Sequence, residues 1–106
     1  MVSGNTVVAV ASERSPLPAV SLSEVLATSD VPGGVVNLLT GRRDELAPHL
    51  AAHLDVDALD LPGSDAELER AAADNVKRVV FSKPGESLYD ISSFLELKTV
   101  WHPMGQ

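Results

Sequence analysis

The stretch Thr6-Val7-Val8-Ala9-Val10-Ala11 sets the fold class, because it is a short, continuously apolar run rich in β-branched residues. Such a run predicts a strand that is covered on both faces in a parallel sheet. Val35-Val36-Asn37-Leu38-Leu39 predicts a second strand of the same kind. Residues 56–61 and 76–81 predict two more, the former weaker because aspartates interrupt it.

Helical patterns separate these predicted strands. Ser15-Pro16 predicts an N-cap followed by proline at the first helical position, and the next apolar residues continue a helix to about Thr28. A second helix is expected over residues 44–53, and a third from Ser64, which forms a capping-box pattern with Glu67. The alternation predicts an α/β fold, with a three- or four-stranded parallel Rossmann-like sheet and flanking helices.

The end of the chain departs from this alternation. Residues 91–94 predict a turn of helix, and residues 95–101 alternate apolar and polar side chains as an extended strand does. We therefore expect an α/β domain over residues 1–86 and a C-terminal extended arm over residues 87–106. An unpaired apolar strand invites association, so this arm is expected to need a partner.

Composition excludes several classes of function. The formal net charge is -7 and no run of Lys or Arg is present, which opposes binding to nucleic acid or to an anionic membrane surface. No apolar stretch approaches the roughly 20 residues that span a bilayer, and a cytoplasmic protein is expected. The chain has no cysteine, which removes disulfides, thiolate metal sites and thiol nucleophiles.

Several stretches, taken in order along the chain, resemble motifs of the aldehyde dehydrogenase superfamily. They are Gly4-Asn5-Thr6-Val7-Val8 with Ser12-Glu13, Pro32-Gly33-Gly34-Val35-Val36-Asn37-Leu38-Leu39-Thr40-Gly41, Val56-Asp57 with Gly63-Ser64, Asn75-Val76-Lys77-Arg78-Val79, and Phe94-Leu95-Glu96-Leu97-Lys98-Thr99-Val100-Trp101. Together they cover most of the chain, and the resemblance implies the cofactor-binding region and the C-terminal oligomerisation strand of that family.

The resemblance implies that four residues contact NAD(P), and these are Glu13, Gly41, Gly63 and Ser64. Other positions depart from the family pattern. Val10 replaces the lysine that holds the adenosine ribose, and Leu68 replaces the second glycine near the pyrophosphate. Asp65 and Glu67 add negative charge beside that site. We therefore expect that no cofactor is required and that NAD(P) binding, if retained, is weak.

The chemistry that the resemblance implies needs a cysteine thiolate and a general-base glutamate. No cysteine exists, and the glutamate position falls on Ser82. We expect no catalytic residues, and hence a pseudoenzyme that serves as a structural or interaction subunit. The alternative is a residual NAD(P)-binding module of an aldehyde oxidoreductase, and a third hypothesis is an enzyme of another class on the same scaffold.

Two further groups of residues carry binding expectations. The resemblance implies an oligomerisation surface in the arm, formed by Leu95, Leu97, Val100 and Trp101. Its partner is expected to be a second copy of the chain or a catalytic aldehyde dehydrogenase subunit. His49 and His53 would share one face of a helix, but solvated histidines are commoner there than metal ligands, and no metal is expected.

Overall fold

Four short strands and four helices make up the part of the chain that the computed structural model describes, which is residues 3–83, 85, 87–96, 99–101 and 105. In chain order the elements are β1 (Val7–Val10), α1 (Leu17–Ala27), β2 (Val36–Leu39), α2 (Arg43–Ala52), β3 (Ala58–Leu61), α3 (Ala66–Asp74), β4 (Arg78–Phe81) and α4 (Leu88–Ser92). The predicted alternation of strands and helices, and with it the α/β class, is confirmed.

The strands pair as two parallel ribbons. β1 pairs with β2 in the first ribbon, with Val7 opposite Val36, and β3 pairs with β4 in the second ribbon, with Ala58 opposite Arg78. Among the described residues no hydrogen bonds join the two ribbons into the single three- or four-stranded sheet that the sequence predicted. The short strands explain this difference in part, since four residues a strand give few hydrogen bonds with which to extend a sheet.

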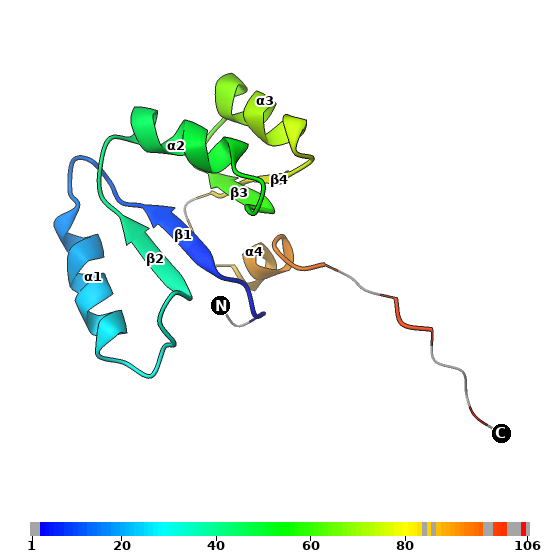
Figure 1. The fold of residues 1–106 in the computed structure, drawn as a ribbon, viewed down its shortest axis with the longest axis horizontal. Coiled ribbons are helices and arrows are strands. Elements are labelled where there is room, and N and C mark those ends of the chain that lie inside the picture. The colour runs from blue at the N-terminus through cyan, green and yellow to red at the C-terminus, as the bar shows by residue number, and fades with distance from the viewer. Residues whose placement is uncertain (1–2, 84, 86, 97–98, 102–104, 106) are drawn as a thin grey trace.

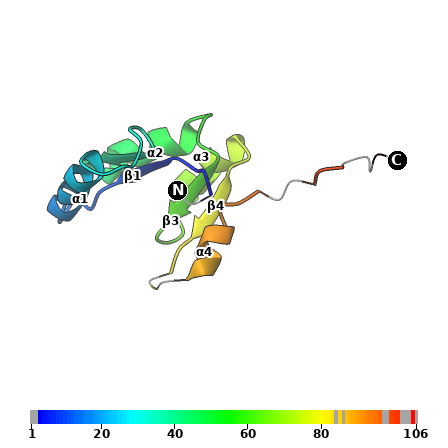
Figure 2. The same ribbon diagram turned by 90° about the horizontal axis from the view of Figure 1, so that it is seen from below.

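The second ribbon carries the core. Ala51 of α2, Leu61 of β3, and Leu68 and Ala72 of α3 are the buried apolar residues of the described chain. Leu59 and Val79 pack against this cluster from the strands. Because strand side chains alternate between faces, Ala58 and Arg78 then point to the opposite face. Figure 2 shows α3 and α4 on opposite sides of β4.

Helix α2 links the two ribbons. It begins after β2, contacts β1 and α3, and ends before β3. Figure 1 shows β3 and β4 on the side of β1 away from β2. Helix α1 contacts β2, but none of its residues is fully buried. In the part of the chain described, no helix combines the length and the hydropathy needed to cross a membrane.

Two predicted strands begin two residues later than the sequence suggested. β3 begins at Ala58 rather than Val56, and β4 begins at Arg78 rather than Val76. The later start of β4 has a clear cause, because Val76 and Lys77 belong to the C-terminal cap of α3. The N–H of Val76 donates to the carbonyl of Ala73 and that of Lys77 to Ala72, at 3.0 Å each, which is a Schellman motif.

Candidate functional site

The carboxyl ends of β1 and β2 form an open depression of about 330 Å³. Its lining residues come from the two loops that follow these strands, and they are Ser12, Glu13, Pro16, Thr40, Gly41 and Arg42. In open α/β sheets ligands bind outside the carboxyl ends of parallel strands, so this edge is the candidate site. Two of the four predicted cofactor contacts, Glu13 and Gly41, meet here.

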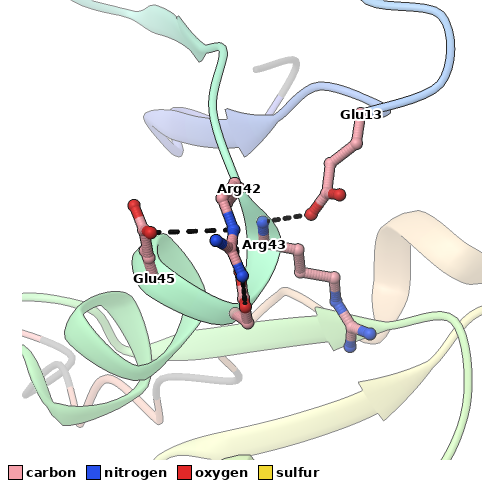
Figure 3. A network of polar contacts seen from close by, with 5 residues as sticks. Glu13, Arg42, Arg43 and Glu45 are labelled. Atoms are coloured by element: carbon pink, nitrogen blue, oxygen red, sulfur yellow. Dashed lines mark hydrogen bonds and ion pairs between the residues drawn. The ribbon is translucent and has the colours of Figure 1, made fainter.

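Glu13 is already engaged within the protein. Its Oε1 accepts a hydrogen bond from the backbone N–H of Arg43, the first residue of α2 (Figure 3). The N-cap residue of α2, Arg42, provides no side-chain cap, so the carboxylate of Glu13 satisfies an N–H that would otherwise be free at the helix N-terminus. Glu13 therefore acts as a cap supplied from the β1–α1 loop.

Arg42 forms an exposed ion-pair network in the same turn. Its guanidinium pairs with Asp44, and its Nε lies 3.6 Å from Glu45 Oε1 (Figure 3). The hydrogen bond from Arg42 lowers the pKa of Asp44 below its ordinary value, and the same bond raises the pKa of Arg42. These pairs engage the only basic group that lines the depression among the described residues.

Gly41 has a structural reason to be glycine. A Cβ at this position would lie 3.0 Å from Cδ1 of Leu46 in α2, so the Leu46 side chain would have to shift by a few tenths of an ångström. The close approach belongs to the β2–α2 turn itself. The fold itself therefore favours glycine at position 41.

Gly63 and Ser64 lie apart from the depression, in the loop between β3 and α3. A Cβ at Gly63 would meet nothing within 4 Å, so the local fold does not require glycine there. Ser64 Oγ donates to Oε1 of Glu69 at 2.7 Å. The structure thus brings Glu13 and Gly41 together but does not bring Gly63 and Ser64 into the same depression.

The N-terminus of α3 differs from the predicted capping box. Asp65, not Ser64, is the N-cap, and its Oδ1 accepts from the N–H of Leu68 at 3.3 Å. Glu69, not Glu67, accepts the N–H of Asp65, at 2.8 Å. The register is one residue later than predicted. Leu68 is 6% exposed and belongs to the hydrophobic core cluster.

Ser82, at the position predicted for a general base, lies at the end of β4. Its Oγ donates to Oδ2 of Asp60 on β3 at 2.7 Å, and its N–H donates to Oδ1 at 3.3 Å. These two bonds clamp the carboxyl ends of the second ribbon. Sequence reasoning missed Asp60 because a lone aspartate in a strand gives no motif.

The C-terminal arm is attached to both ribbons at its beginning. Nη1 of Arg78 donates to the carbonyls of Ser93 and Leu95, at 2.9 Å each, and the side chain of Asn5 donates to the carbonyl of Phe94 at 2.9 Å. The strand predicted over residues 95–101 is not formed by residues 95, 96 and 99–101. A strand needs a partner for its backbone groups, and no element of the described chain lies alongside to supply one.

The predicted oligomerisation residues are accessible where they are described. Trp101 is 91% exposed, Val100 is 80% exposed and Leu95 is exposed to a lesser degree. Leu97 lies outside the described residues. Nothing in a single chain tests whether these residues meet a partner, and the oligomerisation surface stays a prediction.

His49 and His53 are the two histidines that the sequence predicted to share one face of a helix. Nδ1 of His53 accepts the N–H of Asp55 at 3.2 Å, and the carbonyl of His53 accepts from Lys77. Across the residues that the structure covers, no three His, Asp or Glu side chains gather with metal-binding geometry. The two bonds of His53 instead shape the end of α2.

Comparison with known proteins gives one consistent result. Residues 1–102 match the model of the aldehyde dehydrogenase family. The chain is 38% identical over 88 residues to a mitochondrial aldehyde dehydrogenase of Leishmania tarentolae, covering 79% of this chain and 18% of that protein. It is 35% identical over 91 residues to the NADP/NAD-dependent aldehyde dehydrogenase PuuC of Escherichia coli K12, covering 82% and 18%.

A third relative extends the match further along the chain. Aldehyde dehydrogenase 1A1 of Equus caballus is 30% identical over 100 residues, covering 91% of this chain and 20% of that protein. The chain therefore spans about a fifth of the length of the relatives that it matches. Because the family model matches nearly all of its residues, this chain belongs to the aldehyde dehydrogenase family.

Proposed function

We propose that this chain is a non-catalytic aldehyde dehydrogenase-like module that serves as a structural or interaction subunit. One observation carries the proposal, namely that the sequence contains no cysteine. The aldehyde oxidation that the family resemblance implies requires a cysteine thiolate, because the covalent intermediate that delivers the hydride forms on sulfur. No other side chain of the chain can supply that sulfur nucleophile.

The position of the general base supports the same proposal. Ser82 carries a hydroxyl, which has no charge with which to take a proton from water near neutral pH. Its Oγ donates to Asp60, so its local role is to hold β4 against β3. The absence of cysteine and the serine at the aligned general-base position both support the non-catalytic assignment.

The exposed apolar surface supports the interaction part of the proposal. Val100 and Trp101 are largely exposed, and Leu17, Leu22 and Val25 of α1 are exposed as well. Exposed large apolar groups of this kind mark interaction surfaces. We propose a second copy of the chain, or a catalytic aldehyde dehydrogenase subunit, as the partner of residues 87–106.

We also propose that the two ribbons are parts of one Rossmann-like sheet over residues 1–86, with β1 and β3 as its inner neighbours. The path of α2 supports this, since the helix leaves β2, passes β1 and enters β3. A parallel βαβ crossover follows such a path when its two strands flank a third.

The alternative, a residual NAD(P)-binding module, has one observation in its favour. Glu13 and Gly41 line the same depression at the carboxyl ends of β1 and β2. The bond from Arg43 to Glu13 opposes it, because a ligand would have to displace that cap. Saturable binding of NAD in the micromolar range would support the alternative.

The first test of the proposal is an oxidation assay. The purified chain should produce no NADH or NADPH from short aliphatic and aromatic aldehydes with NAD or NADP, respectively, while a complete aldehyde dehydrogenase assayed in parallel does. Turnover that persists after repurification would overturn the non-catalytic assignment.

The second test addresses assembly. Light scattering should report a dimer or larger species for the unmodified chain, or a complex when a catalytic aldehyde dehydrogenase is added. The variant Val100→Asp/Trp101→Asp should lose that species, whereas Tyr89→Asp, an equally exposed position on α4, should keep it. A monomer under every condition would refute the assembly role.

A further inference from the structure

The N-termini of α2 and α3, which follow β2 and β3, both hold carboxylates of this chain. The free N–H groups and the positive dipole end of such a helix are what an anionic ligand normally uses. Glu13 occupies this position at α2, and Asp65 and Glu69 occupy it at α3. The family match implies a dinucleotide, so the question is whether these sites fit its pyrophosphate.

At α3 three donors are already used. Asp65 accepts a hydrogen bond from the N–H of Leu68, and Glu69 accepts hydrogen bonds from the N–H of Asp65 and from the hydroxyl of Ser64. These three donors are therefore not available to a phosphate at this junction. A phosphate that approached this junction would also lie beside the carboxylates of Asp65 and Glu69, which repel a polyanion.

The two helix N-termini are linked through one arginine. Nη2 of Arg43 lies 3.6 Å from Oδ2 of Asp65, while the backbone N–H of the same Arg43 donates to Glu13. The cation that stands between the two loops is thus paired with the internal carboxylate rather than open to a ligand. The donor set at this edge does not fit a pyrophosphate.

We infer that Asp65 and Glu69 act as an internal anion at the α3 N-terminus, which replaces the pyrophosphate and prevents a dinucleotide from binding there. The helix is capped without a ligand, so the folded chain gains nothing from NAD. This inference goes beyond the absence of catalysis, because a chain without cysteine would still be free to bind NAD.

The test compares three proteins by isothermal titration calorimetry with inorganic pyrophosphate and with NAD. The variant Asp65→Ser/Glu69→Gln removes both charges but keeps a residue that caps helices well. Glu67→Gln, in the same first turn, is the matched control for a change in charge. Melting curves first establish that each protein is folded, and Glu69→Gln alone replaces the double variant should that one unfold.

We expect no saturable binding of either probe to the unmodified chain or to Glu67→Gln up to millimolar concentration. The double variant should bind pyrophosphate at least tenfold more tightly, with amide shifts at residues 64–68 in NMR spectra. Saturable NAD binding to the unmodified chain with shifts at those amides would overturn the inference. Equal, undetectable binding to all three proteins would overturn it too, since the carboxylates would then not be what excludes the anion. Neither result depends on the oxidation assay.

Discussion

Val76 adopts a backbone conformation that β-branched residues avoid. Its φ is 56° and its side chain is 91% exposed, so no packing compensates for the strain. The position is the C′ residue of the Schellman motif at the end of α3, where glycine is usual.

Replacing Val76 by glycine should therefore stabilise the protein. Left-handed backbone costs an L-residue about 1–2 kcal/mol, and the added flexibility of glycine in the unfolded chain offsets part of the gain. We expect Val76→Gly to raise the free energy of unfolding in urea by about 1 kcal/mol. Val76→Ala, which keeps a Cβ, should change it far less, and a destabilised glycine variant would contradict this account.

Arg42 should control the titration of Asp44. In Arg42→Gln the pKa of Asp44 should rise toward its ordinary value, because the hydrogen bond that lowers it is lost. A lowered folded-state pKa contributes stability above the ordinary pKa, and that stability is lost as pH falls through the lowered value. NMR titration of the Asp44 carboxyl measures the change. An unchanged pKa in Arg42→Gln, or an equal shift in Arg14→Gln, would contradict the assignment.

The segment directly after helix α4 is held by two side chains, those of Asn5 before β1 and Arg78 on β4. The helix is short and none of its residues is buried, so these hydrogen bonds carry much of its attachment. Arg78→Met keeps the apolar stem of the side chain and removes its donors.

In Arg78→Met we expect hydrogen exchange of the amides of residues 93–95 to become several times faster. Arg70→Met, a change of the same type on α3, serves as the control and should leave these amides unaffected. Mass spectrometry of the C-terminal peptide reports both. Equal exchange in Arg78→Met and the unmodified chain would show that other contacts hold α4.

The helices and strands were predictable from the sequence, but some of their first and last residues were not. Apolar runs and helical periodicity identified β1, β2 and α3, because both signals are local. The N-cap moved from Ser64 to Asp65 since either residue caps well, and packing of Leu68 in the core decided between them. The attachment of residues 93–95 by Arg78 was not predictable, because it joins side chain to backbone across a long stretch of chain.

The candidate site was predictable to a similar extent. Sequence motifs selected Glu13 and Gly41, and the parallel strands bring them together. The same motifs gave no sign that the carboxylates of Glu13 and Glu69 would accept N–H groups at the helix N-termini. Charge in the first turn of α3 was visible as Asp65-Ala66-Glu67-Leu68-Glu69, but which carboxylate meets which N–H depends on the register of the helix.

The molecule as a whole has a small core on one side and an apolar helix on the other. The buried cluster lies between α2, α3 and the second ribbon, whereas Leu22 and Val25 on α1 are exposed. Exposed apolar groups on a helix lower solubility without adding stability.

Leu22→Glu/Val25→Lys should therefore raise the solubility limit of the protein severalfold and lower its binding of a hydrophobic dye. The melting temperature should change by no more than a few degrees, because neither side chain is buried. Leu61→Glu, a charge placed in the core, should unfold the chain instead. A large loss of stability in the α1 variant would mean that this face is covered in solution.

The pairing of each ribbon within its own βαβ unit has a consequence for how the chain acquires its structure. β1 and β2 are separated in sequence only by α1 and its loops, and β3 and β4 only by α3 and its loops. Contacts between near neighbours in sequence form quickly, since little loop entropy is lost in closing them. We therefore expect each unit to nucleate on its own during synthesis, with docking across α2 as the late, slower step that limits the rate of refolding.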